Sequence, residues 1–318
     1  MNAEIIKLLK KSSDYLSGED LSKKLSMSRA AVWKHIEELR RLGYAIDAIS
    51  RRGYRLSAVP DKIFAWEIQD GLTTKVFGKE FHYHEKISST MGKLWKKGLA
   101  GSPEGTVVCA ETQTAGRGRL GRKWVSPGGG IYFSLLLRPT LPRMDLPKLT
   151  LMTAVALAEA LREASGIDVK IKWPNDLLIN KKKVAGILTE LNAESDRIKF
   201  LIIGIGVNVN TLKKDLPAEA TSFSVEAKKD FSRVKVAQSI LGSLEKWYAL
   251  ANRRDFVSIF KCWKDFSGTL GQTIRFDDGQ KVISGVAVDL AEDGSLIIKQ
   301  ADGKLVKKMS GDVILSHA

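Results

Sequence analysis

The sequence has 318 residues, of which 44% are hydrophobic and 27% are charged, and its formal net charge is +15. These proportions are typical of a soluble globular protein with a sizeable core and two or three domains. A transmembrane protein is not expected, because no apolar run approaches the roughly 18 residues of a membrane span. A signal peptide is not expected either, because the N-terminus returns to charged residues too soon.

The cysteines, the histidines and the charge limit the compartment and the partners. The two cysteines, Cys109 and Cys262, are far apart in apolar surroundings, which indicates reduced thiols in a cytoplasmic protein. The four histidines show no metal-ligand spacing, so no metal site is predicted from them. A strongly basic chain favours polyanionic partners such as nucleic acid or nucleotides.

Residues 1–60 have the pattern of a DNA-binding domain. Ser28 can cap a helix whose apolar residues, such as Val32 and Ile36, repeat on one face, and a shorter helix precedes it across a tight turn. Two such helices followed by a hairpin with a basic tip indicate a winged helix-turn-helix, and the segment resembles that domain of bacterial regulators. A small helical domain that binds protein is the alternative. The expected DNA contacts are Ser28, Arg29, Lys34, Arg51 and Arg52.

Residues 64–268 alternate helical and strand signals after a short linker at residues 58–61. Short apolar runs predict buried strands, and a longer apolar run over residues 149–164 predicts a helix. A central mixed sheet with helices packed on it is expected, so the predicted fold class is α+β with a central α/β domain.

Residues 269–318 are predicted to form a small β-domain. Three Asp-Gly pairs, beginning at Asp278, Asp293 and Asp302, lie between short alternating runs, and Asp-Gly between strands is a strong hairpin signal. Five short strands in so short a segment indicate an SH3-like barrel. The segment shows no catalytic constellation of its own.

The stretch Gly116–Gly130 (GRGRLGRKWVSPGGG) carries the strongest functional signal. Its glycines cannot build a core, but its backbone N–H groups and arginine side chains can bind an anion between two buried strands. A basic surface loop without a ligand is the alternative. The run misses the phosphate-loop pattern, and Gly204-Ile205-Gly206 lacks the third glycine of a dinucleotide fingerprint.

Three pieces in order resemble the biotin protein ligases. They are the loop Ser88–Thr90, the run GRGRLGRKW-SP, and KWPNDLLINKKKVAGIL at residues 172–188. With the N-terminal winged helix, the chain resembles the bifunctional form, which is both biotin ligase and biotin operon repressor. The match covers nearly the whole length, so the resemblance implies that residues 64–268 are the ligase domain.

The resemblance implies a two-step reaction with biotin and ATP as substrates and Mg²⁺ as cofactor. Biotin's carboxylate attacks the α-phosphate of ATP, and biotinyl-5′-AMP then gives biotin to a lysine of the biotin carboxyl carrier protein, a subunit of acetyl-CoA carboxylase. The resemblance also implies operator DNA as a partner, biotinyl-AMP as corepressor, and a homodimer that forms when the loop orders over the ligand.

The resemblance also implies roles for single residues. Lys183, Arg119 and Asp176 are the implied catalytic residues, although Lys183 could instead be a solvated cation and Asp176 a turn residue. Trp124 either offers an aromatic face to adenine or belongs to the core. The implied biotin contacts are Ser89, Thr90, Gln113, Arg117, Gly118, Arg119 and Lys183. The implied ATP or adenylate contacts are Arg117, Arg119, Arg122, Trp124, Lys172, Asn175 and Asn208.

One residue departs from the family pattern, and two other functions stay open. Met91 follows Thr90 where the family often has asparagine, so a side-chain contact to biotin is not expected there. One alternative is a biotin-sensing regulator without catalysis, although sensing would not need every charged group of the loop. The other is a lipoyl-type ligase, which shares the fold and the acyl-adenylate chemistry; the GRGRLGR form and the Ser-Ser-Thr loop favour biotin.

Overall fold

The structure is a computed structural model that describes residues 1–194, 197–277, 279 and 281–315. It divides into two compact units, Met1–Lys62 and Ile63–Ala318. Among the described residues, no helix is long and apolar enough to cross a membrane.

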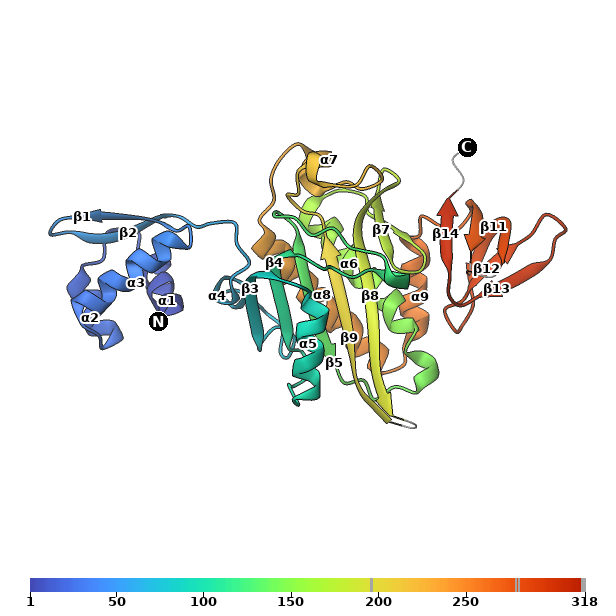
Figure 1. The fold of residues 1–318 in the computed structure, drawn as a ribbon, viewed down its shortest axis with the longest axis horizontal. Coiled ribbons are helices and arrows are strands. Elements are labelled where there is room, and N and C mark those ends of the chain that lie inside the picture. Colours follow the sequence, from blue (N-terminus) through green and yellow to red (C-terminus); the bar gives the residue numbers. More distant parts are fainter. Residues whose placement is uncertain (195–196, 278, 280, 316–318) are drawn as a thin grey trace. The chain divides into compact units, whose positions relative to one another are not determined.

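The first unit consists of three helices followed by a two-stranded antiparallel hairpin, coloured blue in Figure 1. Its elements are α1 (Asn2–Lys11), α2 (Gly18–Leu25), α3 (Arg29–Arg41), β1 (Ala45–Ile49) and β2 (Gly53–Ala58). Ser28 caps α3 as predicted, because its hydroxyl oxygen accepts a backbone N–H at 3.2 Å, and Ser17 caps α2 in the same way at 3.0 Å. The fully buried side chains of α3 include Val32 and Ile36. The predicted winged helix-turn-helix is confirmed.

The second unit is built on a seven-stranded sheet in the order β3-β4-β5-β9-β8-β7-β6. The strands are β3 (Phe81–Ile87), β4 (Val107–Gln113), β5 (Ile131–Leu137), β6 (Lys170–Lys172), β7 (Asp176–Ile179), β8 (Lys182–Glu194) and β9 (Arg197–Val207). The helices are α4 (Ala65–Gln69), α5 (Thr90–Leu99), α6 (Lys148–Ser165), α7 (Phe223–Ala227), α8 (Arg233–Asn252) and α9 (Phe256–Asp265). β3 and β4 pair in parallel and the other neighbours pair antiparallel, so the predicted mixed sheet is confirmed.

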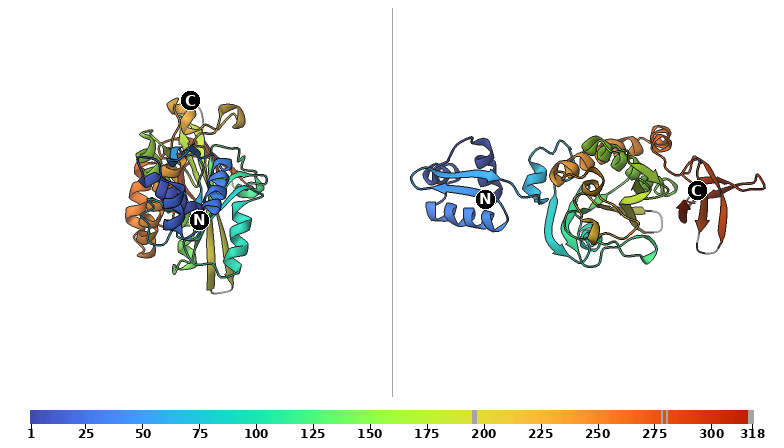
Figure 2. Two further views of the ribbon diagram at one scale, coloured as in Figure 1. Left: turned by 90° about the vertical axis from the view of Figure 1, so that its left-hand side faces the viewer. Right: turned by 90° about the horizontal axis from the view of Figure 1, so that it is seen from above.

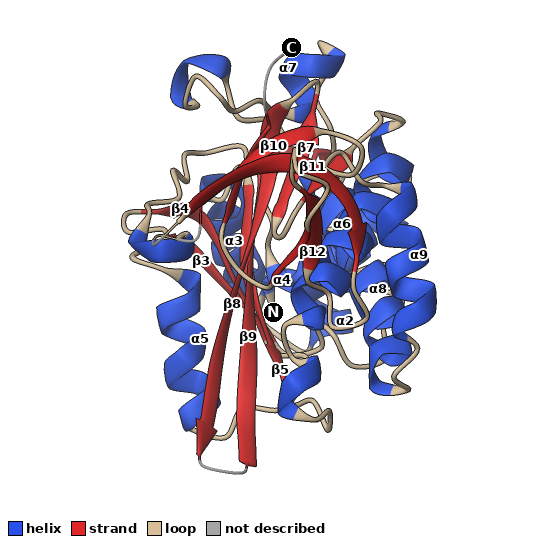
Figure 3. Ribbon diagram, turned by 90° about the vertical axis from the view of Figure 1, so that its right-hand side faces the viewer, coloured by secondary structure: helices blue, strands red, loops and turns tan. Residues whose placement is uncertain are grey.

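The two faces of this sheet are covered by different helices (Figure 2 and Figure 3). On β9, Phe200 and Ile202 belong to the small apolar cluster with α5, whereas Leu201 and Ile203 belong to the large core with α6, α8 and α9. This alternation follows from the two-residue period of a strand. Of the described helices, α5 packs on this face, on β4, β5 and β9, and the rest of the face is left for a pocket.

The C-terminal strands form a five-stranded antiparallel sheet in the order β13-β12-β11-β10-β14. They are β10 (Thr273–Asp277), β11 (Val282–Leu290), β12 (Leu296–Lys299), β13 (Leu305–Lys308) and β14 (Asp312–Leu315). Gly294 and Gly303 have φ values of +84° and +85°, as the predicted Asp-Gly turns require. Asp278 of the third predicted turn lies outside the described residues. The small β-domain is therefore present as this sheet.

The C-terminal sheet shares a core with the central one. The ring centroids of Trp173 and Phe276 lie 6.0 Å apart, and the indole N–H of Trp173 donates to the carbonyl oxygen of Gly294 at 3.3 Å. Ile274 and Phe276 of β10 belong to the large apolar core of the second unit. The division into three domains, at residues 1–60, 64–268 and 269–318, stays a prediction.

Replacing Leu157 of α6, which is fully buried, by alanine should destabilise the second unit by about 2–5 kcal/mol, because the substitution leaves a cavity between α6 and its neighbours. The midpoint of urea unfolding would measure this loss. Leu99→Ala is the control, since Leu99 is 61% exposed and its truncation should change stability by less than about 0.5 kcal/mol. Equal effects of the two substitutions would contradict the assigned core.

Candidate functional site

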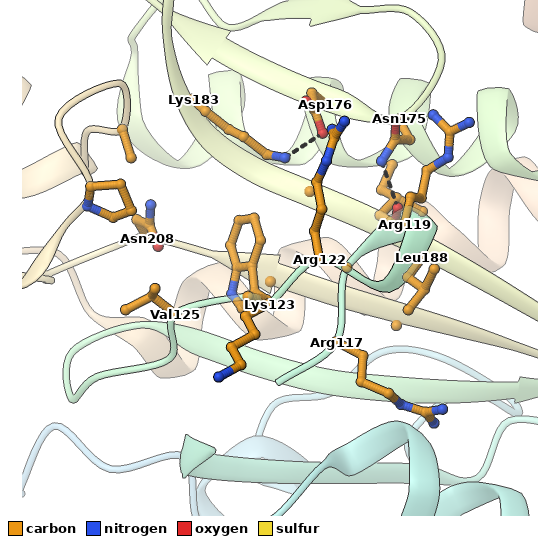
Figure 4. A pocket seen from close by; sticks show the side chains of 18 of the residues that line it. Arg117, Arg119, Arg122, Lys123, Val125, Asn175, Asp176, Lys183, Leu188 and Asn208 are labelled. Carbon is orange, nitrogen blue, oxygen red and sulfur yellow. Dashed lines mark hydrogen bonds and ion pairs between the residues drawn. The ribbon is translucent and has the colours of Figure 1, made fainter. Parts of the chain in front are cut away.

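A pocket of about 510 Å³ opens on the α5 face of the central sheet (Figure 4). Its size is in the range of small-molecule sites. β8 and β9 form its floor. The loop Gly116–Gly130, here called the arginine loop, lies over this floor with residues between 117 and 125. The N-terminus of α5, the β6–β7 turn, residues 216–220 and β14 complete the lining.

A row of residues in register crosses four strands at the pocket floor. Lys172 of β6 lies opposite Asp176 of β7. Asp176 lies opposite Gly186 of β8, and Gly186 lies opposite Gly206 of β9. Directly opposed residues of antiparallel strands project to the same face of the sheet. The row therefore ends in two glycines, which place no side chain of their own over the backbone there.

Trp124 of the arginine loop fills the space above these glycines. A Cβ atom at Gly206 would lie 2.5 Å from the indole, and one at Gly186 would lie 2.8 Å from it. The amine of Lys183 lies 5.2 Å from the centroid of the indole. Trp124 is half-buried and lines the pocket, so the alternative that it is a core residue is wrong.

The arginine loop is a closed hairpin. The N–H of Gly118 donates to the carbonyl of Arg122 at 2.7 Å, and the N–H of Trp124 donates to the carbonyl of Gly116 at 2.9 Å. A Cβ atom at Gly116 would lie 2.4 Å from the carbonyl oxygen of Trp124, so only glycine allows this closure. Leu120 is exposed in the bend, with a φ of +55°.

Two arginines of the loop are paired with acidic residues of other elements. Arg117 makes a two-point contact with Glu190 of β8, with N–O distances of 3.1 and 3.3 Å. Arg122 pairs with Asp312, the first residue of β14. These pairs hold the loop against both the central sheet and the C-terminal sheet.

Three further cations of the lining, Arg119, Lys172 and Lys183, lie near the β6–β7 turn. Arg119 donates to the side-chain oxygen of Asn175 at 2.9 Å, and the amine of Lys183 forms an ion pair, not aligned as a hydrogen bond, with Asp176 at 2.7 Å (Figure 4). Burial lowers the pKa of Arg119 and that of Lys172. A bound anion would offset this burial, because an opposite charge favours the protonated form. The lining holds seven Arg and Lys against three Asp and Glu, so the pocket attracts anions.

The end of the pocket near α5 is a hydrogen-bonded network. The side-chain oxygen of Gln113 accepts the N–H of Thr90 at 2.8 Å and its hydroxyl at 3.2 Å. The amide nitrogen of Gln113 donates to the Ser126 hydroxyl at 3.0 Å, and the Ser134 hydroxyl donates to that of Thr90 at 2.9 Å. The network fixes the side chains of Thr90 and Gln113, which line the pocket, in one orientation.

Besides Asp176 Oδ1, which is ion-paired with Lys183, three buried polar atoms of the lining have no hydrogen-bond partner among the described residues. They are Ser89 Oγ, Trp124 Nε1 and Asn208 Oδ1. An unpaired buried polar atom costs about 1–3 kcal/mol, so such atoms in a pocket indicate a polar ligand. They include both donors and acceptors, and the ligand must therefore offer both.

The first unit exposes part of α3. Arg29, Trp33 and Lys34 are exposed there, and Trp33 shows 55% of its surface. The side chain of Ser28 is occupied in capping the helix. Trp33 was not among the expected DNA contacts, although it lies exposed between two of them, Arg29 and Lys34, on the same helix.

The wing arginines differ in their surroundings. Arg51 lies in the β1–β2 turn with a φ of +66°. Arg52 is paired with Asp14 at 2.9 Å and lies over the ring of Tyr15, as Arg55 does, at 4.7 and 4.8 Å. Arg52 therefore has intramolecular partners that local sequence patterns do not reveal.

Comparisons with known proteins find matching families for segments of both units. Family models match residues 2–55 as an HTH domain, 83–208 as the biotin/lipoate A/B protein ligase family, and 269–316 as the biotin protein ligase C terminal domain. The bifunctional ligase/repressor BirA of Bacillus subtilis is 43% identical over 309 residues, which is 95% of this chain and 94% of that protein. The chain belongs to the bifunctional biotin ligase/repressor family.

Two further likenesses support this family. The biotin–[acetyl-CoA-carboxylase] ligase of Paracoccus denitrificans is 32% identical over 216 residues, covering 66% of this chain and 89% of that one. A solved biotin protein ligase from Aquifex aeolicus, in complex with biotin and ATP, has a TM-score of 0.66 at 32% identity and covers 76% of this chain and 100% of that one. The resemblance, and with it the bifunctional ligase/repressor function, is confirmed.

The fold gathers the predicted ligase-family site residues into this one pocket. They are Ser89, Thr90, Gln113, Arg117, Gly118, Arg119, Arg122, Trp124, Lys172, Asn175, Asp176, Lys183 and Asn208. Their roles toward ligands stay predictions. Asp312 and Ile314 of the C-terminal sheet also line the pocket and were not predicted from the sequence. Nothing local in the sequence marks them, because they reach the site only through tertiary packing.

Met91, the departure from the family pattern, also lines the pocket. It is 3% exposed, and its sulfur would lie 2.6 Å from a Cβ atom at Gly204 of β9. Met91 therefore packs on a third glycine of the floor as an apolar wall.

Gly206→Ala should displace Trp124 from the pocket floor, because the added methyl group would overlap the indole. The fluorescence contributed by Trp124, taken as the difference between each chain and its Trp124→Phe form, should become more sensitive to acrylamide quenching. Gly242→Ala is the control, since a Cβ atom there meets nothing within 4 Å. An unchanged Trp124 contribution in Gly206→Ala would contradict this packing.

Proposed function

We propose that the pocket binds biotin beside ATP, joins them as biotinyl-5′-AMP and transfers biotin to a lysine of a carrier protein. The observation that carries this proposal is the convergence of Arg119, Lys172 and Lys183 on a pocket that also holds unpartnered polar atoms. Biotin and ATP are the ligands named for the Aquifex aeolicus structure. The carrier is the biotin carboxyl carrier protein, the acceptor expected for an acetyl-CoA-carboxylase ligase.

The first step brings two anions together. A carboxylate oxygen of biotin attacks the α-phosphorus of ATP, the bond to the bridging oxygen of the β-phosphate breaks, and pyrophosphate leaves. Repulsion between the reactants opposes this approach, and fixed cations reduce it most where water is excluded. Arg119 and Lys183 serve this purpose at the carboxylate and the α-phosphate.

The polar end of the pocket suits the ureido ring of biotin. That ring offers two N–H donors and one carbonyl acceptor, and it needs partners in fixed positions. The unpartnered hydroxyl of Ser89 and the network of Thr90 and Gln113 supply them. The backbone of Arg117 and Gly118 lies along the same lining. Met91 supplies an apolar wall for the rest of the bicycle.

The adenylate occupies the side of Trp124. The indole offers a face for adenine, and the free side-chain oxygen of Asn208 can accept from its amino group. Arg122, Lys172 and Asn175 bind the phosphates. ATP enters as its magnesium complex, because Mg²⁺ is usually held by substrate phosphates together with one or two carboxylates.

The second step needs a neutral amine. The acceptor lysine attacks the acyl carbon, AMP leaves with the electron pair of the acyl–oxygen bond, and the amine loses a proton. Asp176 is the carboxylate beside Lys183 at 2.7 Å, and it accepts this proton or orients the incoming amine. Lys183 stabilises the charge on the acyl oxygen.

The first unit binds operator DNA through α3 and the wing. Arg29 and Lys34 contact phosphates or base edges, and Arg51 reaches the backbone from the wing. Biotinyl-AMP acts as corepressor by ordering the arginine loop, which completes a surface for a homodimer that suits a two-fold operator. Both cysteines are free thiols, in keeping with a cytoplasmic protein.

Two other functions are less well supported. A biotin sensor without catalysis would not need the Lys183–Asp176 pair beside the phosphate site. A lipoyl-type ligase would bind an apolar dithiolane, for which the hydrogen-bonding end at Ser89 and Gln113 has no use.

Lys183→Met should lower the rate of biotin-dependent pyrophosphate release by about 10²- to 10³-fold, because one fixed donor at the reacting centre is removed. Its neighbour Lys182 is exposed on the same strand, and Lys182→Met should leave the rate unchanged. Equal rates of pyrophosphate release in the two variants would contradict a catalytic role and show that Lys183 is a solvated surface cation.

Lys34→Ala should weaken operator binding and reduce the slope of log affinity against log salt by about one, because one phosphate contact is lost. Fluorescence anisotropy of labelled operator DNA at several salt concentrations would measure both. Lys7→Ala on α1, also exposed, should leave the slope unchanged. The same slope in wild type and Lys34→Ala would remove Lys34 from the interface.

A further inference from the structure

A buried ion pair lies close to the pocket without belonging to its lining. Arg233, the first residue of α8, donates from Nη1 to Glu111 Oε2 of β4 at 2.7 Å. The two side chains are only 4% and 8% exposed. Burying such a pair carries a large desolvation cost, and well-packed apolar residues often stabilise a core equally well. Stability alone therefore does not explain it.

The pair holds the C-terminal end of the arginine loop. Arg233 Nη1 also donates to the carbonyl of Gly130, the last residue of the loop, at 2.9 Å. The carbonyl before it, that of Gly129, accepts the N–H of Asn210 at 2.7 Å. The guanidinium of Arg233 and the backbone N–H of Asn210, both outside the loop, thus hold the consecutive carbonyls of Gly130 and Gly129.

The backbone at this end has little room to move. A Cβ atom at Gly130 would lie 2.1 Å from the hydroxyl of Tyr132, and that hydroxyl donates to the carbonyl of Pro127 at 2.9 Å. Gly129 has a φ of +86°, which favours glycine. The end of the loop is therefore a rigid anchor, and Trp124 lies only three residues before Pro127.

Glu111 connects the anchor to two further parts of the chain. Its Oε1 accepts the N–H of Ile63, the first residue of the second unit, at 3.0 Å. Glu111 also lies two residues before Gln113, which bonds to the loop through Ser126. One carboxylate thus fixes the start of the unit and a strand that enters the pocket.

We propose that Glu111 and Arg233 are positioning residues that fix the anchor of the arginine loop, and through it hold the loop over the bound adenylate. The proposal rests on the function proposed for the pocket. Neither side chain touches the reacting atoms; the pair acts by setting where Trp124 and the loop arginines stand.

The test compares four chains. Arg233→Met removes the donor to Gly130. Glu111→Leu/Arg233→Met replaces the pair by apolar residues and leaves no buried unpaired charge, so it also covers failure of the single variant to fold. Arg233→Lys keeps the positive charge and an N–H donor but not the planar guanidinium. Glu159→Gln is the control, because Glu159 pairs with Lys246 of the same helix, away from the loop.

The first measurement is hydrogen exchange of the amides at residues 128–130 and of Asn210, whose N–H donates to the carbonyl of Gly129, and it needs no ligand. The proposal expects exchange there to rise about tenfold or more in the apolar double variant, to stay near the wild-type rate in Arg233→Lys and to be unchanged in Glu159→Gln. Unchanged exchange at residues 128–130 and at Asn210 in the double variant would overturn it.

The second measurement separates positioning from general stability. The KM for biotin and the rate of adenylate release should each rise about tenfold in the double variant, with kcat nearly unchanged and recovery in Arg233→Lys. Wild-type KM and release rates in a double variant of unaltered melting temperature would contradict the proposal. Absence of biotin-dependent pyrophosphate release in the wild type would refute the proposed ligase function instead, and hydrogen exchange would still decide the role of the pair.

Discussion

Holding several cations around one small, partly buried pocket is the constraint on which the rest of the site depends. Like charges repel, and burial lowers the pKa of Arg119 and Lys172. The fold meets this cost with Asp176 beside Lys183, and with Glu190 and Asp312 for arginines of the loop. More cations than carboxylates remain in the lining, and that excess is what an anionic substrate needs.

Glycines explain how a loop and a sheet approach closely enough to form this site. Gly186 and Gly206 oppose each other on adjacent strands, and their missing side chains admit the indole of Trp124. Gly116 allows the loop to close on itself. These glycines lie in strands or at a loop hinge, where each gives up stability to permit a close contact.

The sequence predicted those parts of the fold and site that depend on local patterns. The cap at Ser28 marked a helix of the first unit, and Asp-Gly pairs marked C-terminal hairpins. The arginine loop and the KWPND turn were found because their chemistry is continuous along the chain. The five-residue helices α4 and α7 were missed, since a single turn shows no helical period.

Contacts between segments that are distant in the chain could not be predicted from the sequence. Asp312 reaches Arg122 only because the C-terminal sheet packs on the core around Trp173. Trp124 could equally have been a core residue, and only the packing of the loop on the sheet shows that it rests on two opposed glycines. The buried pair of Glu111 and Arg233 joins residues more than a hundred positions apart, and no local pattern indicates such a pair.

The central claim is that biotin and ATP react in this pocket. The most direct measurement incubates the purified chain with radiolabelled biotin, Mg-ATP and a biotin carboxyl carrier domain. We expect biotin-dependent release of pyrophosphate and label on the carrier lysine, both absent without ATP. Biotin binding without pyrophosphate release would reduce the chain to a sensor, and the lack of any biotin binding would contradict the account.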